Sequence, residues 1–286
     1  MKNIALLGIG AMGERIATNP IDAGYQLHIW NRTAQKCQSL VTRGAIAHKT
    51  PQETVRSASV VISLVTGDCA SRNVWLDKTT GAIYGLKPNT IAIESSTLTP
   101  AWCQELAKEV NRHNCNFLDA PVVGSRPQAE TSQLIYLVGG RANILEDVRS
   151  ILTINSQAIH HVGEVGTGMT MKLAVNTLFG IQVAALSEIL ALLNKTEISV
   201  ELAVALLNQL PITSPALVGI GKLIKDRNYA PLFPIDLVAK DFRYSKQLGQ
   251  SVDAKIPVVT AIENIYREAS KRYGEDNITG VAQLFF

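Results

Sequence analysis

Three glycines near the start of the chain have the spacing of a nucleotide-binding turn. Gly8, Gly10 and Gly13 follow a short apolar run, 4–7, and precede a stretch with helical periodicity, 12–23. Gly8 allows a tight turn, Gly10 lets the backbone approach a pyrophosphate, and Gly13 lets the helix pack closely on the strand while its N-terminus faces the anion. We therefore predict a dinucleotide site over an ordinary strand, turn and helix. The residues predicted to line this turn are Gly8, Ile9, Gly10, Ala11, Met12 and Gly13.

The end of the second strand candidate indicates which dinucleotide is bound. Asn31, Arg32 and Thr33 stand where an NAD-binding protein usually has an acidic residue for the ribose 2′-hydroxyl. A carboxylate would repel a 2′-phosphate, whereas a guanidinium can bind it through paired, charge-assisted hydrogen bonds. These three residues favour NADP, and the alternative is that Arg32 is a solvated surface side chain.

A lysine and an asparagine lie four residues apart in an otherwise apolar stretch. Lys172 and Asn176 would share one face of a helix, about one turn from each other. A buried lysine is costly unless it has partners or a function, whereas a lysine near a helix end can also extend to solvent. The spacing alone leaves both interpretations open.

Three loops that follow strand candidates carry further polar groups, and we expect them to open on one edge of a sheet, near the nicotinamide end of the cofactor. Serine and threonine at strand ends often only cap helices. Because Thr99 is expected to cap the next helix, Ser96 and Thr97 would be available to a ligand. The three loops are Val65-Thr66-Gly67-Asp68, Ser95-Ser96-Thr97 and Asp119-Ala120-Pro121-Val122-Val123-Gly124-Ser125.

Together these features resemble the β-hydroxyacid dehydrogenase family over the whole chain. The residues at 31–33, 124–126 and 129–130 look most like its glyoxylate and succinic semialdehyde reductase branch, which uses NADPH. Four motifs in the order of the family carry the resemblance: Gly8-x-Gly10-x-Met12-Gly13, Asp119-Ala120-Pro121-Val122, Gly166-x-Gly168-x-x-x-Lys172-x-x-x-Asn176 and Lys240-Asp241.

The resemblance implies a role for each site residue. Lys172 would protonate the carbonyl oxygen as hydride reaches the carbon, and a partly dehydrated cation suits that task because it also stabilises a nascent alkoxide. Asn176 would orient the substrate or the lysine, and Asp241 would be a structural partner. The further cofactor ligands would be Val65, Thr66, Thr97 and Lys240. The substrate ligands would be Ser96, Thr97, Val123, Gly124, Ser125, Lys172, Asn176 and Lys240.

Three features depart from the family pattern or from regular helix geometry. Val123 stands where family members commonly have serine, so a hydroxyl contact to the substrate is lost. Pro127-Gln128 reverses the expected order, which leaves the shape of that loop open. Pro20 removes an N–H from the first helix and clashes with the carbonyl of Ile16, so a kink or an early end is expected there.

The resulting hypothesis is an NADPH-dependent reductase of small aldehyde acids. Oxidation of 3-hydroxyisobutyrate or another short β-hydroxy acid is the alternative within the same chemistry. An imine reductase would share the architecture but typically lacks the lysine, and a non-catalytic dehydrogenase-like scaffold would have lost it. Retention of Lys172 and Asn176 argues against both.

The pattern of elements predicts a Rossmann-type, mostly parallel α/β sheet over residues 1–162 and an all-helical substrate and oligomerisation domain over 163–286. Thr50-Pro51-Gln52-Glu53 forms a capping box, and Thr99-Pro100 repeats its first half. Strand candidates are 4–7, 26–30, 45–48, 60–64, 90–94, 116–119, 134–138 and 158–161. Helices of the second domain are expected at 169–195, 199–210, 215–225, 235–249 and 257–273.

Composition indicates a globular protein. Its 286 residues are 47% hydrophobic and carry a net charge of +3 with no long run of one sign, so neither a nucleic-acid partner nor a membrane surface is indicated. The apolar stretch 173–193 contains polar residues and reads as a buried helix rather than a membrane span. We expect it to lie between the domains and to reach a second copy in a homo-oligomer, a dimer or tetramer; a core helix in a monomer is the alternative.

Neither disulfides nor a metal site is expected. The four cysteines show no CxxC spacing, and the strand candidate at the very start leaves no room for a leader, so we expect a reduced, cytoplasmic protein. His160 and His161 would point to opposite faces of a strand, which is poor geometry for one ion. His28, His48 and His113 are isolated in the sequence.

Overall fold

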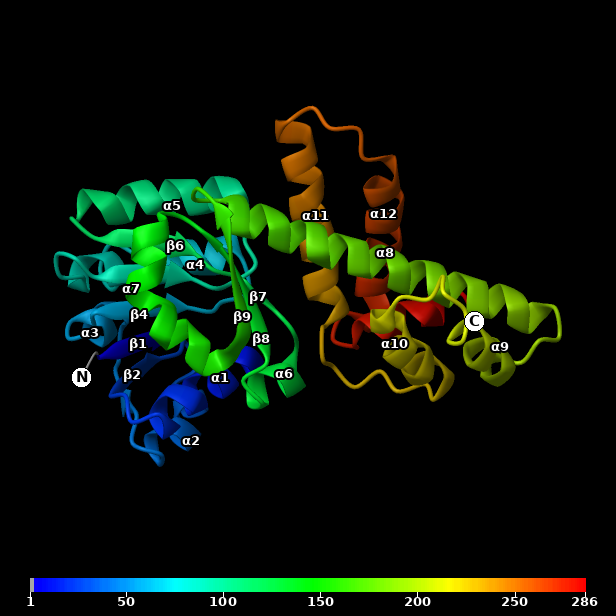
Figure 1. The fold of residues 1–286 in the computed structure, drawn as a ribbon, viewed down its shortest axis with the longest axis horizontal. Coiled ribbons are helices and arrows are strands. Elements are labelled where there is room, and N and C mark those ends of the chain that lie inside the picture. Colours follow the sequence, from blue (N-terminus) through cyan, green and yellow to red (C-terminus); the bar gives the residue numbers. More distant parts are fainter. Residues whose placement is uncertain (1–2) are drawn as a thin grey trace. The chain divides into compact units, whose positions relative to one another are not determined.

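The computed structural model describes residues 3–286, which form two compact units, 3–172 and 173–286. The first is a mixed but mostly parallel sheet covered by helices, and the second consists of helices joined by loops (Figure 1). The predicted fold class is confirmed. The strands are Ile4–Leu7 (β1), Leu27–Trp30 (β2), Ile46–Ala47 (β3), Val60–Ser63 (β4), Ile91–Glu94 (β5), Asn116–Asp119 (β6), Val122–Val123 (β7), Leu134–Gly139 (β8) and Ser156–Gly163 (β9).

The sheet order is β3-β2-β1-β4-β5-β6-β8-β7, with β9 paired to β8. Strands β1 to β6 run parallel, β8 is antiparallel to β6 and to β7, and β9 is parallel to β8. The order reverses between β1 and β4, because the chain crosses from one side of β1 to the other. In sheets of this kind, ligands bind outside the carboxyl ends of the strands at such a switch point.

Alternate side chains of each buried strand face opposite layers of helices. Ile4 and Leu6 of β1 pack in the layer with α1, α6 and α7, whereas Ala5 and Leu7 pack in the layer with α3, α4 and α5. Both faces are therefore apolar, as a covered parallel sheet requires. The helices of this unit are Ala11–Asp22 (α1), Ala34–Cys37 (η1), Gln38–Val41 (α2), Pro51–Val55 (α3), Asp68–Leu76 (α4), Ala82–Gly85 (η2), Pro100–Arg112 (α5), Arg126–Glu130 (α6), Ala142–Leu152 (α7) and Thr153–Asn155 (η3).

Helix starts follow the predicted caps. Thr50 and Thr99 each accept a hydrogen bond from the backbone N–H three residues later, with proline in the first turn. The Glu53 carboxylate accepts from the N–H of Lys49 rather than from Thr50. Pro20 lies inside α1, and the helix ends two residues beyond it, at Asp22.

The helical unit packs around a second core. Gly180, midway along α8, leaves room for the stacked rings of Phe242 and Tyr266, whose centroids are 5.2 Å apart, and the Tyr266 hydroxyl donates to the Gly180 carbonyl at 2.9 Å. The elements are Thr167–Lys195 (α8), which begins in the first unit, Val200–Leu207 (α9), Pro215–Lys225 (α10), Ile235–Ser251 (α11), Pro257–Tyr273 (α12) and Ile278–Leu284 (η4).

Among the described helices, α8 alone has the length and composition that could cross a membrane. Its most apolar window has a mean hydropathy of 1.6, and 44% of that window is buried inside the protein.

Candidate active site

The glycine-rich turn has the geometry that its spacing predicts. Gly8 adopts φ +106°, and a Cβ there would collide with the carbonyl oxygen of Leu64. A Cβ at Gly13 would collide with the carbonyl of Gly8, whereas one at Gly10 would meet no atom within 4 Å. The turn is therefore packed on its inner side and open at Gly10, so its backbone and the N-terminus of α1 can accommodate a pyrophosphate.

Asn31 and Arg32 follow β2 and differ in their surroundings. The Asn31 side-chain oxygen accepts from the N–H of Ile9 at 3.0 Å, and its nitrogen donates to the carbonyl of Thr33 at 2.9 Å, so Asn31 braces the glycine turn. Within residues 3–286, the exposed Arg32 has no hydrogen-bond or ion-pair partner. Its guanidinium is available to an anion.

The loops after β4 and β5 are tied to each other. The N–H of Val65 donates to the Ser96 hydroxyl oxygen at 2.7 Å, and that hydroxyl donates to the Glu94 carboxylate at 2.5 Å. Ser96 is 2% exposed, Thr97 is half-buried and Thr66 is exposed. Ser96 is therefore engaged by its own neighbours, whereas Thr66 and Thr97 lie nearer the surface. The involvement of Glu94 is not apparent from the sequence motifs.

The loop after β6 forms the short strand β7 and then α6. Gly124 adopts φ +124°, Val123 is half-buried, and Ser125 caps α6. The Gln128 side chain accepts from the N–H of Ser125 at 2.9 Å and completes a capping box. The Pro-Gln order at 127–128 thus forms a regular helix start, with proline in the first turn and glutamine at the third position.

The start of α8, which carries Lys172, is held by a buried carboxylate. Asp119, at the end of β6, accepts from the N–H of Gly166 and from the N–H of Met169, both at 2.8 Å. A Cβ at Gly168 would collide with the carbonyl of Leu137, so glycine is required for this close approach. Burial raises the pKa of Asp119 to about 6, against the effect of these hydrogen bonds. Lys172, one turn further along, is 8% exposed.

Asn176, in the helical unit, is held by α11. Its amide nitrogen donates to Asp241 at 2.6 Å, which leaves the amide oxygen to a different partner. Lys240 Nζ lies 3.0 Å from the other oxygen of Asp241 and 5.0 Å from the ring centroid of Tyr244. Asn176 and Asp241 are 8% and 2% exposed. Asp241 is thus the structural partner of Asn176 and Lys240.

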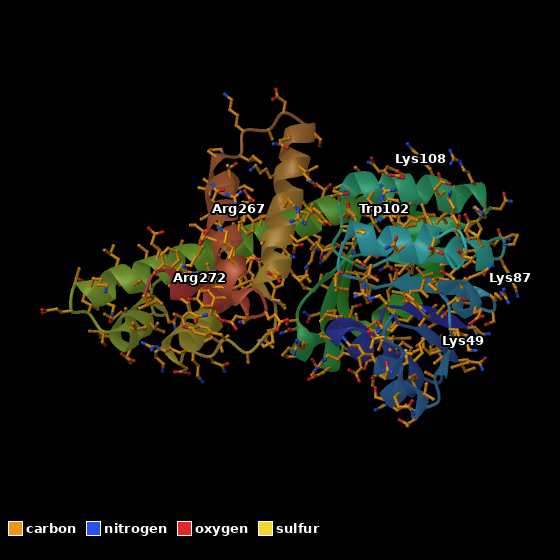
Figure 2. The ribbon with its side chains drawn as sticks, turned by 180° about the vertical axis from the view of Figure 1, so that it is seen from behind. Lys49, Lys87, Trp102, Lys108, Arg267 and Arg272 are labelled. Carbon is orange, nitrogen blue, oxygen red and sulfur yellow. The ribbon has the colours of Figure 1, made fainter. Side chains whose placement is uncertain are left out.

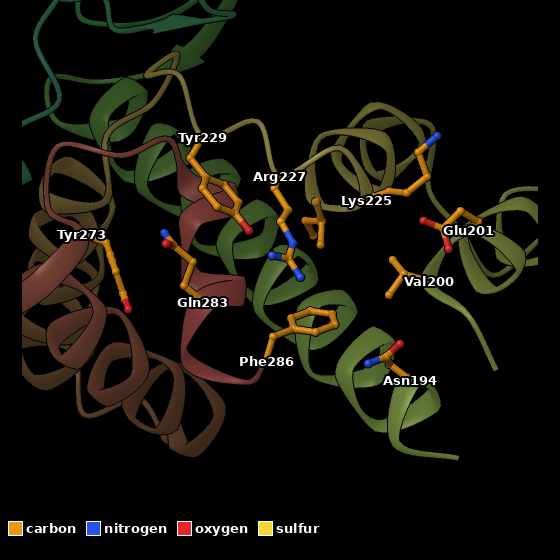
Figure 3. Close-up of a pocket in the computed structure, with 10 residues that line it drawn as sticks. Asn194, Val200, Glu201, Lys225, Arg227, Tyr229, Tyr273, Gln283 and Phe286 are labelled. Atoms are coloured by element: carbon orange, nitrogen blue, oxygen red, sulfur yellow. The ribbon is translucent and has the colours of Figure 1, made fainter. Parts of the chain in front are cut away.

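A cavity of about 520 Å³ opens elsewhere in the helical unit, and Figure 3 shows Arg227 and Tyr229 projecting into it. It contains none of the predicted site residues. Asn194, on its wall, is 18 residues beyond Asn176 on α8, about 27 Å along the helix axis at 1.5 Å per residue. This cavity is not the nucleotide site.

Two histidines that are isolated in the sequence are neighbours in the structure. His28 Nδ1 lies 2.8 Å from His48 Nε2, and His28 Nε2 lies 3.0 Å from the Ser57 hydroxyl. They meet because β2 and β3 are paired in the sheet, with His28 opposite Ile46. Residues 3–286 contain no group of three or more histidine, cysteine or acidic side chains that could hold a metal ion.

Both halves of the chain match known nicotinamide-binding families. Residues 3–163 match the NAD binding domain of 6-phosphogluconate dehydrogenase. Residues 166–285 match the NAD-binding domain of NADP-dependent 3-hydroxyisobutyrate dehydrogenase. Together with the glycine turn, these matches define a nicotinamide-dependent oxidoreductase.

Relatives match along the whole chain. The chloroplastic glyoxylate/succinic semialdehyde reductase 2 of Arabidopsis thaliana is 32% identical over 95% of this chain and 75% of its own length. Glyoxylate/succinic semialdehyde reductase 1 of the same plant is 29% identical over 93% of this chain and 92% of its own length. The structure of Mycobacterium tuberculosis 3-hydroxyisobutyrate dehydrogenase with L-serine shares the fold, with a TM-score of 0.91, 23% identity and 99% coverage of both chains. The chain belongs to the β-hydroxyacid dehydrogenase family, and it acts on CH–OH groups.

Proposed function

We propose that the protein is an NADPH-dependent reductase of small aldehyde acids, with glyoxylate and succinic semialdehyde as substrates. The observation that carries the choice of coenzyme is Arg32, an exposed guanidinium without a partner in the described chain, two residues after the end of β2. No carboxylate stands at 31–33 to repel a 2′-phosphate. The two plant relatives named as reductases of these aldehydes support the choice of substrate.

When bound, the reduced nicotinamide supplies a hydride to the carbonyl carbon. Lys172 donates the proton that the carbonyl oxygen needs, and its positive charge stabilises that oxygen as negative charge develops on it. Its 8% exposure strengthens both effects, because a charge acts more strongly where water is excluded. Asp119 fixes the start of the helix that carries the lysine. We assign Asn176 to orienting the lysine or the substrate.

We assign recognition of the substrate carboxylate to Thr97, Ser125 and the backbone N–H groups of Val123 and Gly124. Val123 contributes no hydrogen-bond donor from its side chain, so binding relies on the backbone and on neighbouring hydroxyls. Lys240 is assigned to cofactor and substrate binding on the family resemblance.

A panel of carbonyl compounds tests the proposal. Purified protein is to be assayed for oxidation of NADPH and of NADH with glyoxylate, succinic semialdehyde and other short oxo acids. Turnover of the aldehyde acids with preference for NADPH supports the reductase. Three outcomes would contradict it. Oxidation of 3-hydroxyisobutyrate by the oxidised coenzyme, without reduction of the aldehyde acids, would indicate a short β-hydroxyacid dehydrogenase. Turnover only with a ketone plus an amine would indicate an imine reductase, and cofactor binding without any turnover would indicate a scaffold.

We also propose that α8 mediates a homo-oligomer. The exposed side of α8 carries an apolar residue every seven positions: Leu178, Ala185 and Leu192, with Ile189 beside them. Leu178 is 59% exposed, Leu192 58% and Ile189 44%. A seven-residue repeat keeps these side chains on nearly the same side of the helix, where they can pack against the same side chains of a second copy. Sedimentation should give at least a dimer, and Leu178→Glu with Leu192→Glu should give a monomer. A monomeric wild type would contradict this assignment.

A further inference from the structure

Glu94, at the end of β5, is a buried carboxylate that accepts four hydrogen bonds. One oxygen accepts from the Ser96 hydroxyl at 2.5 Å and from the Ser96 N–H at 3.1 Å. The other accepts from the Ser71 hydroxyl at 2.7 Å and from the indole N–H of Trp75 at 2.9 Å. Glu94 is 0% exposed, so these bonds replace its hydration.

The donors define the ionisation state that fits. The indole N–H of Trp75 and the backbone N–H of Ser96 can only donate, and each faces a different oxygen of Glu94. The Ser71 hydroxyl accepts from Trp102 on α5 (Figure 2), so its own hydrogen is directed to Glu94. An ionised carboxylate satisfies every donor, whereas an amide at position 94 would turn an N–H toward an N–H in either orientation.

Ser96 connects this carboxylate to the loop after β4. Its hydroxyl donates to Glu94 and accepts from the N–H of Val65, so both functions of the hydroxyl are used. A second tie joins the same two loops, because Asp68 accepts from the N–H and the hydroxyl of Thr99 at 2.9 and 2.6 Å. The backbone at Val65 is therefore positioned from β5.

We propose that Glu94 is a positioning residue for cofactor binding. It acts through Ser96 on Val65, and we call this chain of hydrogen bonds the brace. Ser96 then serves the brace instead of binding the substrate. The inference rests on the proposed function only in taking the loop at 65–66 as part of the cofactor site. It reassigns one residue, Ser96, and leaves Thr97 as the side chain of this loop that can reach a ligand.

The test is Ser96→Ala, followed by titration of the tryptophan fluorescence with NADPH and by steady-state kinetics. Loss of one hydrogen bond that orders the loop should raise the Kd and the KM for NADPH about fivefold to tenfold. The KM for the aldehyde acid, measured at saturating NADPH, should stay within about twofold, because that change is below what one lost hydrogen bond costs. A raised KM for the aldehyde acid with unchanged NADPH binding would overturn the proposal and make Ser96 a substrate ligand.

Ser95→Ala is the matched control. Ser95 is the adjacent serine, is equally buried at 2% exposure, and its hydroxyl has no hydrogen-bond partner in the described structure. Its removal should leave NADPH binding unchanged. If Ser95→Ala and Ser96→Ala weakened NADPH binding equally, any small cavity at this point would have the same effect. That result would reject the brace.

Glu94→Gln tests the carboxylate itself. The variant should weaken NADPH binding at least as much as Ser96→Ala, and the double variant should bind no more weakly than Glu94→Gln alone, because both changes break one connection. Additive effects would contradict the brace. If Glu94→Gln does not fold, the two serine variants still decide. Because NADPH binding is measured without substrate, failure of the brace is distinct from failure of the reductase assignment, in which the wild type binds NADPH but reduces no aldehyde acid.

Discussion

Arg32 and Lys172 are two cations to which we assign chemistry, and they lie in opposite environments. Arg32 is exposed, lies two residues beyond the end of β2, and has no partner in the described chain. Lys172 is 8% exposed and lies on a helix whose first turn is fixed by Asp119. Recognition of a phosphate needs a guanidinium that can reach it, whereas proton transfer needs an ammonium held in place and shielded from water.

The residues that hold the two regions in place differ in burial. Asn31, which is half-buried, braces the glycine turn through Ile9, 22 positions earlier in the chain, and also contacts Thr33. Glu94 and Asp119 act on residues that the sheet brings together, with Asp119 reaching about fifty positions along the chain to Met169. Both ends of the site therefore depend on tertiary contacts, and they differ in that the two carboxylates are fully buried whereas Asn31 is not.

The largest effect is expected at the catalytic end. Lys172→Ala should lower kcat by about 10²–10⁴-fold, the usual contribution of a general acid, with the Kd for NADPH nearly unchanged. Stopped-flow oxidation of NADPH and a binding titration measure the two quantities. Lys195→Ala, at the other end of α8, is the control and should be as active as the wild type. A Lys172→Ala enzyme with full activity would remove the assigned role.

Asp119 should make stability depend on pH. Its pKa in the folded protein is about 6, above the ordinary value of 3.8, so the folded state holds its proton over a range where the unfolded chain has lost it. Its contribution to stability is therefore fully present below pH 3.8 and is lost as the pH rises through about 6. Relative to Asp119→Asn, the unfolding free energy of the wild type should fall by about 3 kcal/mol over this interval. Urea unfolding of both proteins at several pH values measures it, and a difference independent of pH would refute it.

The phosphate end should show a smaller effect that depends on the coenzyme. Arg32→Ala should weaken NADPH binding by about tenfold to a hundredfold, the cost of hydrogen bonds to a charged group, and NADH binding by much less. Fluorescence titration with each coenzyme measures the ratio. Arg56→Ala, another exposed arginine, should alter neither. Equal losses for the two coenzymes would show that Arg32 does not bind the phosphate.

The smallest effect is expected at Val123. Val123→Ser adds a donor beside the backbone groups assigned to the carboxylate, so the KM for glyoxylate should fall by about twofold to fivefold. Val123→Ala removes the methyl groups without adding a donor and should give no such gain. If both variants behave alike, the carboxylate does not bind at this position.

The parts of the fold that could be predicted are those with a local cause. The apolar runs at β1 and β6 and the helices beginning at Pro215 and Pro257 have the predicted bounds, because hydrophobic periodicity and proline at a helix start act within a few residues. The strand Val122–Val123 was not predicted, since two residues carry no periodicity and its pairing with β8 supplies its hydrogen bonds. The helix expected at 199–210 ends earlier, at Leu207.

The candidate site divides in the same way. The glycine turn could be predicted because the spacing of Gly8, Gly10 and Gly13 after an apolar run is visible in the sequence. The structural roles of Glu94 and Asp119 could not, because they depend on partners brought close by the sheet. One signal was present: each is an acidic residue that ends a buried apolar strand, where a carboxylate must find donors.

Transfer of deuterium from NADPH labelled at the transferable position of its nicotinamide tests the central claim most directly. With glyoxylate and wild-type protein, we expect the product to carry one deuterium on the former carbonyl carbon. With the same labelled NADPH, the Lys172→Met variant should bind the coenzyme but form almost no labelled product in the same time. Product without the label would contradict direct hydride transfer. Equal amounts of labelled product from the two proteins in the same time would contradict the role of Lys172.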